Sequence, residues 1–325
     1  MAEQPAEGAQ FEHVAAFYRS TGEYLDQVLG FVTAGLARAD PVLVAVPGPK
    51  IGLLRGGLHR QAAQVGFADM QTMGANPAWI IPRVRAFVDA HPGRPVRYVG
   101  EPIWETRTAA ELNEATRHEA LINLAFAGTT ASILCPYDAS GLAPGVIANA
   151  ERTHPRLVRG GHLQPSDAYT AAPVFPADCD QPLPAPPDGA ASLSYRYELA
   201  QVRAFVSEHA HRAGLPSGQA GDLVIAVSEL AANTVRHTRA GGVLHMWATG
   251  REVICQVRDT GYIRDPLAGR RPLPPDAGSG HGLRVVYQIC DLVELRTSSA
   301  GGTTIRLHMR LPAGAGGQVW GAGRG

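Results

Sequence analysis

The sequence predicts two domains, an α/β domain with a largely parallel sheet over about residues 10–158 and an α+β domain over about residues 192–312. Three observations predict this division. The chain has 325 residues, about twice the length of a usual single domain. A stretch rich in proline and glycine over 159–191 is typical of a linker. Before the linker, short strand-like runs alternate with helical patterns, whereas after it the strand-like runs come in consecutive pairs. A glycine-rich tail occupies 313–325.

Composition excludes several classes of protein. Hydrophobic residues make up 45% of the chain, charged residues 18%, and the net charge is zero, so no strong attraction to nucleic acid or anionic lipid follows. The longest apolar runs are shorter than the roughly 20 residues that span a bilayer, and the first residues lack the basic and apolar regions of an export signal. We therefore expect a cytoplasmic protein with no direct nucleic-acid partner and no membrane association.

The first domain alternates strand-like runs with helical patterns, which favours a parallel sheet. Its strands are expected at 41–47, 96–102 and 130–138, and its helices at 24–38, 53–65, 78–91 and 109–127. The second domain has a different order. Its helices are expected at 197–213, 222–238 and 282–290, and its strands at 243–249, 252–259, 292–298 and 303–311. Helices grouped with a mixed or antiparallel sheet indicate an α+β sandwich.

The helix at 222–238 carries a pair of functional side chains. Apolar residues recur along it at spacings of three and four, which gives one stripe facing the core. Glu229 and Asn233 are four residues apart on the neighbouring face, so both side chains project to one place. A carboxylate can act as a general base, and an amide oxygen can ligate Mg²⁺. Taken alone, this segment is more typical of the border of an amphipathic helix.

Three further segments strengthen the case for a ligand site. The strand at 252–259 ends in Asp259, and the turn residue Gly261 lets a ligand approach this carboxylate closely. Glycines at alternate positions, 278–282, lead into a helix, where exposed backbone amides suit phosphates. The spacing is not that of a dinucleotide fingerprint. Residues 301–304 open the last strand with two glycines and two threonines, so the Thr303 hydroxyl is expected near the ligand.

These four segments, in this order, resemble the Bergerat (GHKL) ATP-binding fold of gyrases, Hsp90 and histidine kinases, most closely its anti-sigma-factor serine/threonine kinase branch. The resemblance implies that Glu229 activates the attacking hydroxyl, that Asn233 binds the Mg²⁺ of ATP, and that Asp259 contacts adenine. The other residues that it places around ATP are Gly261, Gly278, Gly280, Gly282, Leu283 and Thr303. One departure is the sequence TGYIRD after Asp259, which lacks the second glycine of the usual DxGxG.

The resemblance implies a cytoplasmic kinase with ATP and Mg²⁺ as cofactors and an anti-anti-sigma (STAS-type) protein, a sigma factor or both as partners. It also allows a homodimer through this domain. Two alternatives stay open, a non-catalytic ATP-binding switch and a histidine-kinase-type phosphotransfer protein. Self-phosphorylation on histidine is disfavoured, because a proline-rich linker and one helix precede the domain where a helical hairpin with the phosphoacceptor would stand.

The first domain lacks a phosphate loop, since residues 48–52 after the first expected strand do not fit GxxxxGK[ST]. Its segments GEPIW (100–104), RHEALIN (117–123), CPYD (135–138) and THP (153–155) resemble the MEDS sensory domain, a RecA-like module. The resemblance implies a sensor, and strand ends along one sheet edge favour a crevice for a small-molecule ligand. The candidate residues are Glu101, Trp104, His118, Glu119, Cys135, Tyr137 and His154.

These candidates also have structural interpretations. Cys135 suits a core position, and His118 and Glu119 suit capping or pairing on a helix. The mixture of Cys, His and Glu could ligate a transition metal, but no spacing signature supports one. The four cysteines of the chain are widely spaced with no CxxC pair, which indicates free thiols.

Overall fold

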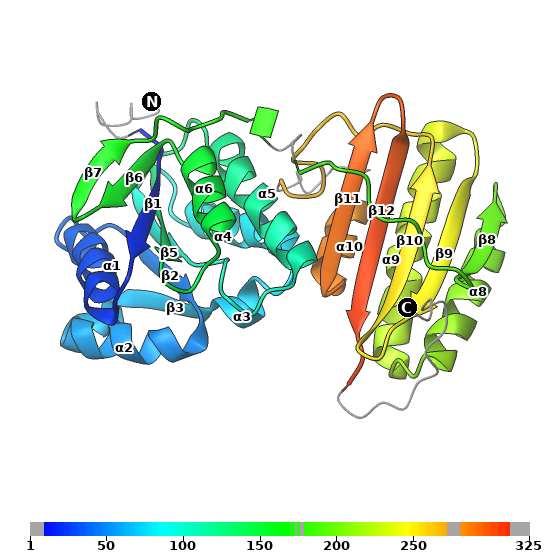
Figure 1. Ribbon diagram of the computed structural model, residues 1–325, viewed down its shortest axis with the longest axis horizontal. Coiled ribbons are helices and arrows are strands. Elements are labelled where there is room, and N and C mark those ends of the chain that lie inside the picture. The colour runs from blue at the N-terminus through cyan, green and yellow to red at the C-terminus, as the bar shows by residue number, and fades with distance from the viewer. Residues whose placement is uncertain (1–9, 173, 176–178, 272–279, 313–325) are drawn as a thin grey trace. The chain divides into compact units, whose positions relative to one another are not determined.

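The computed structural model describes residues 10–172, 174–175, 179–271 and 280–312. The chain divides into two compact units, residues 1–179 and 180–325, whose elements are labelled in Figure 1. This confirms the predicted two-domain architecture. Within the described residues, none of the helices has the length and apolar character needed to cross a membrane.

The amino-terminal unit contains a seven-stranded sheet in the order β3-β2-β4-β5-β1-β6-β7. All neighbouring strands are parallel except β6 and β7, which form an antiparallel pair at the edge. Helices cover both faces of the sheet, so most residues of its central strands are buried. The strands are β1 (Glu12–Tyr18), β2 (Val42–Val46), β3 (Val65–Asp69), β4 (Val96–Gly100), β5 (Ala131–Asp138), β6 (Arg156–Arg159) and β7 (His162–Pro165).

Two groups of helices sandwich this sheet (Figure 1). Val14, Ala16 and Tyr18 of β1 pack in a core with residues of α1 and α2, whereas the alternate residue His13 faces α5. Helix α5 begins with a capping box between Thr108 and Glu111 and is largely buried. The helices are α1 (Thr21–Leu36), α2 (Gly48–Leu58), η1 (His59–Gln64), α3 (Met70–Met73), η2 (Pro77–Trp79), α4 (Ile80–Asp89), α5 (Ala109–Ala125) and α6 (Pro144–Thr153).

The structure differs from the prediction at several places in this unit, including α6 and β6, which were not predicted. Strand β1 was not predicted, and the helix expected at 53–65 ends at Leu58, continues as a 3-10 turn and gives way to β3. Gly56 and Gly57 lie in its last turn, where glycine disfavours continuation. The expected linker over 159–191 is also wrong in its first part, because β7 joins the sheet and Cys179 is buried with Ala120 and Phe175.

The carboxy-terminal unit is a five-stranded antiparallel sheet in the order β11-β12-β10-β9-β8. Helices α8, α9 and α10 lie on one face of it (Figure 1), which confirms the predicted α+β sandwich. The elements are β8 (Ala191–Tyr195), α8 (Leu199–Arg212), α9 (Ser217–Thr238), β9 (Gly242–Ala248), β10 (Glu252–Asp259), α10 (His281–Ile289), β11 (Leu292–Ser298) and β12 (Gly302–Arg310).

The last part of the expected linker belongs to this unit. Arg306 on β12 donates from Nη2 to the carbonyl oxygen of Pro184 at 2.6 Å, and Arg296 on β11 donates from Nε to that of Gln181 at 3.1 Å. The segment then enters β8, an edge strand that the sequence analysis missed. The proline-rich segment expected to be a linker therefore pairs with the sheet at β7 and is hydrogen-bonded to the second domain at Gln181 and Pro184.

Candidate nucleotide site and a buried cluster in the amino-terminal domain

Glu229 and Asn233 on α9 meet the first turn of α10. A Cβ atom placed on Gly282 would lie 2.6 Å from Glu229 Oε2 and 3.3 Å from Asn233 Nδ2, so the backbone approaches both side chains closely. Gly280 is the N-cap of α10 and has a φ of 100°, a conformation that side-chain-bearing residues avoid. The glycines therefore bring the amides at the start of a helix next to a carboxylate and an amide side chain, an arrangement suited to an anion and its metal ion.

Asp259 lies at the end of β10 and is held by three neighbours. Its Oδ1 accepts from the Gly261 amide at 2.7 Å and its Oδ2 from the Thr234 hydroxyl at 2.6 Å. Gly302, with a φ of 77°, packs so tightly here that a Cβ atom would lie 2.1 Å from the Asp259 carbonyl oxygen. The Thr303 hydroxyl in turn donates to the Gly261 carbonyl at 2.8 Å. The carboxylate keeps unused lone pairs for a ligand.

A cavity of about 780 Å³ opens between these segments, within the range of about 300–1,000 Å³ typical of small-molecule sites. Its lining combines a buried apolar part with Asn233, Asp259 and three exposed arginines. The apolar residues are Leu230, Val257, Leu267, Leu283 and Ile305, and the arginines are Arg236, Arg264 and Arg271. Arg236 and Arg264 supply positive charge, and Arg271 pairs with Asp265, which also lines the cavity. The apolar part suits a flat aromatic ring.

The structure brings most of the predicted nucleotide residues together. Those that line the cavity are Asn233, Asp259, Gly261, Gly280, Gly282, Leu283 and Thr303. Glu229 does not line it but lies beside Gly282, and Gly278 lies outside the described residues. The sequence analysis missed the three arginines and the contact of Thr234 with Asp259. Thr234 lies four residues after Leu230 on the buried face of α9, but its hydroxyl orients the carboxylate.

In the amino-terminal unit, a group of polar side chains lies where four parallel strands end. Lys50, just after β2, contacts both the Tyr18 hydroxyl and Glu101 Oε1, and the Tyr18 hydroxyl donates to the same Glu101 oxygen at 3.1 Å. Burial raises the pKa of Glu101 to about 7, although Lys50 and Tyr18 favour its charged form. Glu101 Oε2 is buried and is without a hydrogen-bond partner among the described residues.

A small pocket of about 280 Å³ opens beside this group. Tyr18, Lys50, Trp104 and Asp138 line it, each at or just after the carboxyl end of a parallel strand. This is the edge where an open α/β sheet usually binds its ligands. Of the seven predicted residues, Trp104 lines this pocket, and Glu101 bonds to its lining residues Tyr18 and Lys50.

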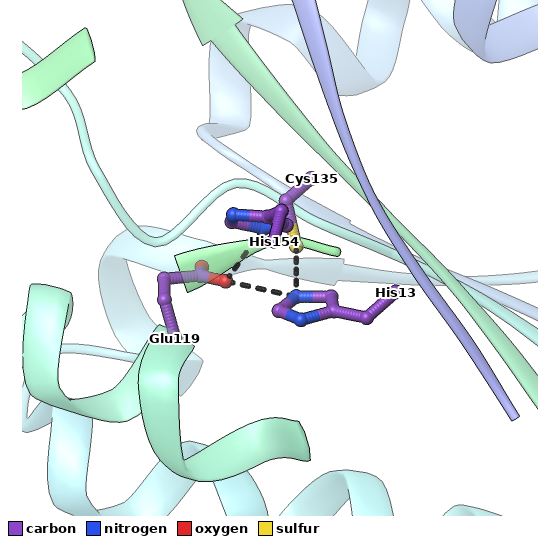
Figure 2. A group of neighbouring side chains, drawn as sticks. All are labelled: His13, Glu119, Cys135 and His154. Carbon is purple, nitrogen blue, oxygen red and sulfur yellow. Dashed lines mark hydrogen bonds and ion pairs between the residues drawn. The ribbon is translucent and has the colours of Figure 1, made fainter. Parts of the chain in front are cut away.

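A second polar group lies deep in the same unit, on the face of the sheet that α5 covers. It consists of His13, Glu119, Cys135 and His154, none of which is more than 1% exposed (Figure 2). Glu119 Oε2 lies 3.1 Å from His13 Nε2 and 3.2 Å from His154 Nε2, and Cys135 Sγ lies 3.4 Å from His13 Nε2. Burial, aided by His154, lowers the pKa of His13 to about 4, so its ring is neutral near pH 7.

The seven predicted sensory residues thus lie in different places. Glu119, Cys135 and His154 meet in the buried cluster, and the Tyr137 ring packs against His154 with centroids 5.6 Å apart. Glu101 and Trp104 belong to the group at the strand ends. His118 is buried on α5 outside the four-residue cluster. Cys135 lies within β5 in the interior, as its core interpretation expected, and not at the end of the strand.

Comparison with known families agrees with both halves of the structure. The model of the MEDS family, the MEthanogen/methylotroph, DcmR Sensory domain, matches residues 12–155. The model of the histidine kinase-like ATPase domain matches residues 193–309. A search of curated proteins found no match. The chain is therefore a signalling regulator in which a MEDS sensory domain is fused to a histidine kinase-like, ATP-binding domain.

Proposed function

We propose that this regulator is an ATP-dependent protein serine/threonine kinase of the anti-sigma-factor type, controlled by its MEDS domain. The observation that carries the proposal is the meeting of Glu229 and Asn233 with the glycine-rich start of α10, beside a cavity that Asp259 also lines. A general base, a Mg²⁺ ligand, a phosphate cradle and an acceptor for an amino group are the parts that phosphoryl transfer from ATP needs.

Each residue has a distinct part in the proposed reaction. Asp259 accepts a hydrogen bond from the amino group of adenine, and the backbone at Gly280 and Gly282 donates to the phosphates. Mg²⁺, held through Asn233, would neutralise charge on the phosphate oxygens. Glu229 takes the proton of a serine or threonine hydroxyl on a partner, whose oxygen then bonds to the γ-phosphorus as the bond to the ADP oxygen breaks.

The proposed partners follow from this class of kinase. The acceptor is an anti-anti-sigma (STAS-type) protein, and the regulator sequesters a sigma factor when the acceptor is phosphorylated. We also propose a cytoplasmic location and a homodimer formed through the ATPase domain. Co-purification from cells, followed by mass spectrometry of the bound proteins, tests the identity of these partners.

Transfer of labelled phosphate from ATP to a STAS-type protein tests the catalytic proposal. Glu229→Gln keeps the size of the side chain but removes the base, so transfer should fall by at least about a hundredfold while ATP still binds. The matched control is Glu208→Gln, an exposed carboxylate on α8, which should transfer at the wild-type rate. Equal rates for Glu229→Gln and the wild type would contradict the role of Glu229.

The two other functions predict different outcomes of the same assay. A non-catalytic switch binds ATP without transferring phosphate to any acceptor. A histidine-kinase-type protein yields an acid-labile phosphoryl product on a separate histidine protein. Failure of the intact chain to bind ATP would contradict all three functions.

For the MEDS domain we propose a small polar ligand in the pocket at the strand ends. The buried Glu101 Oε2 without a partner among the described residues and the adjacent Lys50 and Trp104 favour this site. Its volume of about 280 Å³ lies just below the range of about 300–1,000 Å³ typical of small-molecule sites. Native mass spectrometry of the purified chain should detect a bound molecule that Trp104→Ala releases. An unchanged mass in both proteins would contradict a retained ligand.

A further inference from the structure

The buried cluster has the geometry of a metal site. A tetrahedral ion with ligand atoms at about 2.0 Å places two such atoms about 3.3 Å apart, and a nitrogen and a sulfur about 3.6 Å apart. The Glu119 oxygen lies 3.1 and 3.2 Å from the two histidine nitrogens, and the Cys135 sulfur lies 3.4 Å from His13 Nε2. The four ligand atoms all lie within 4.8 Å of one another, so the widest pair closes by up to about 1 Å when all four bind one tetrahedral ion.

Hydrogen bonds outside the cluster set the tautomer of His13. Asn123 donates from Nδ2 to the Thr153 carbonyl oxygen at 2.7 Å, so its Oδ1 is the atom that faces His13 Nδ1, at 3.1 Å. An amide oxygen only accepts, and His13 Nδ1 therefore carries the ring proton. In the neutral ring, Nε2 is left with a lone pair directed at Glu119 and Cys135.

His154 is oriented in the same way. Its Nδ1 lies 2.8 Å from the Ala150 carbonyl oxygen, which only accepts, and 3.0 Å from the Thr153 hydroxyl, which donates to the Asn149 carbonyl oxygen, so this nitrogen is the protonated one. Its Nε2 lone pair points at the Glu119 oxygen that His13 also faces. Histidine ligands in proteins are typically held by a hydrogen bond from the other ring nitrogen, as both are here.

Without a cation, several hydrogen-bond acceptor atoms face one another at the centre of the cluster. Two lone-pair nitrogens converge on one carboxylate oxygen, and Glu119 Oε1 is buried with no hydrogen-bond partner among the described residues. Acceptors that face each other in a dry interior are costly unless protons or a cation lie between them. A thiolate, a carboxylate and two neutral imidazoles carry two negative charges, which one divalent ion balances.

We propose that His13, Glu119, Cys135 and His154 bind a divalent first-row transition metal ion, with Zn²⁺ as the ion that this mixed nitrogen, sulfur and oxygen set suits best. The thiol and imidazole ligands exclude Mg²⁺ and Ca²⁺, which take oxygen. Binding forms four metal–ligand bonds, to the Glu119 carboxylate, the two imidazoles and the Cys135 sulfur, and releases the thiol proton to solvent. The loaded site is neutral overall.

The ion would join four parts of the MEDS domain. His13 and Cys135 lie on the adjacent strands β1 and β5, Glu119 on α5, and His154 at the end of α6. This inference is independent of the proposed kinase activity, because every ligand lies in the other domain and the test measures metal directly.

The test loads the full-length chain with Zn²⁺, removes unbound ion and measures zinc by mass spectrometry. One ion per chain is expected for the wild type. Cys135→Ser and His13→Gln should each retain less than about a tenth of that amount. The matched controls are Cys179→Ser, a buried cysteine of the same unit outside the cluster, and His162→Gln, an exposed histidine on β7. Both controls should bind zinc as the wild type does.

X-ray absorption of the zinc-loaded wild type needs no variant and decides the case if the ligand variants fail to fold. One sulfur and three nitrogen or oxygen neighbours are expected. Absence of zinc from the loaded wild type, coordination without sulfur, or equal zinc in Cys135→Ser and Cys179→Ser would each overturn the proposal.

Discussion

The reactive side chains of one domain are buried, whereas those of the other line an open cavity. In the MEDS domain, His13, Glu119, Cys135 and His154 are at most 1% exposed, so changes to them act first on folding. In the ATPase domain, Asn233 and Asp259 line an open cavity, so changes to them act first on binding. The difference teaches that one chain can separate residues that hold a fold together from residues that meet a ligand. Four predictions test this separation, from the largest expected effect to the smallest.

The largest effect is expected at the buried cluster. Glu119→Ala leaves His13 and His154 facing an empty space and should lower the free energy of unfolding of the MEDS domain by about 3–5 kcal/mol. Hydrogen exchange of peptides from β1 and β5 measures this loss separately from the other domain. Glu105→Ala, an exposed carboxylate of the same domain, is the control. Equal exchange in the two variants would place Glu119 outside the set of stabilising residues.

A pH effect is expected in the ATPase domain. Burial opposes the charge of His308, but hydrogen bonds and charges of Glu252 and Glu294 outweigh burial and raise its pKa to about 9. Because the folded pKa exceeds the ordinary 6.5, this stabilisation is complete below about pH 6.5 and is lost as pH rises through 9. A shift of this size corresponds to about 3 kcal/mol.

Urea unfolding of the wild type and of His308→Gln between pH 6 and 10 isolates this contribution. The wild type should lose its advantage over the variant as pH rises. Parallel stability curves for the two proteins would show that His308 is not held in its charged form.

A smaller effect on folding is expected beside the cavity. Gly302→Ala places a methyl group against the Asp259 carbonyl oxygen and forces alanine into a positive φ, which should cost about 2 kcal/mol and weaken ATP binding by displacing Asp259. Gly250→Ala is the control, because a Cβ there meets nothing within 4 Å. Thermal unfolding compares the two variants, and equal melting temperatures would contradict the close packing of Gly302.

The smallest effect on folding is expected for Asn233→Ala. Its unfolding free energy should change by less than about 0.5 kcal/mol, whereas affinity for ATP with Mg²⁺ should fall about tenfold. Removal of Mg²⁺ with EDTA should weaken ATP binding by the wild type but not by this variant. An equal effect of EDTA on both proteins would show that Asn233 does not act through the metal ion.

The sequence predicted much of the nucleotide site because its signals are local. Glu229 and Asn233 are one helical turn apart, and Asp259, Gly282 and Thr303 each belong to a short segment at the end or start of an element. Their contacts still required the fold. Periodicity cannot distinguish a buried Thr234 that only packs from one that donates to Asp259.

The buried cluster was only partly predictable for the opposite reason. Glu119, Cys135 and His154 stood out in their segments, but His13 did not, because it lies on β1, a strand that was not predicted. His13 and Cys135 are 122 positions apart and meet through the pairing of β1 with β5. No spacing rule covers such a set, since the parallel order of strands is decided by packing across the whole domain.

Calorimetric titration of the full-length chain with ATP and Mg²⁺ tests the central claim most directly, namely that the cavity between α9, β10 and α10 is the nucleotide site. The control variant is Asp259→Asn, which presents an amide where the carboxylate accepts hydrogen bonds from Thr234 and Gly261. The structure predicts one ATP per wild-type chain and binding at least about tenfold weaker in the variant. No binding by the wild type, or equal affinity in both proteins, would contradict it.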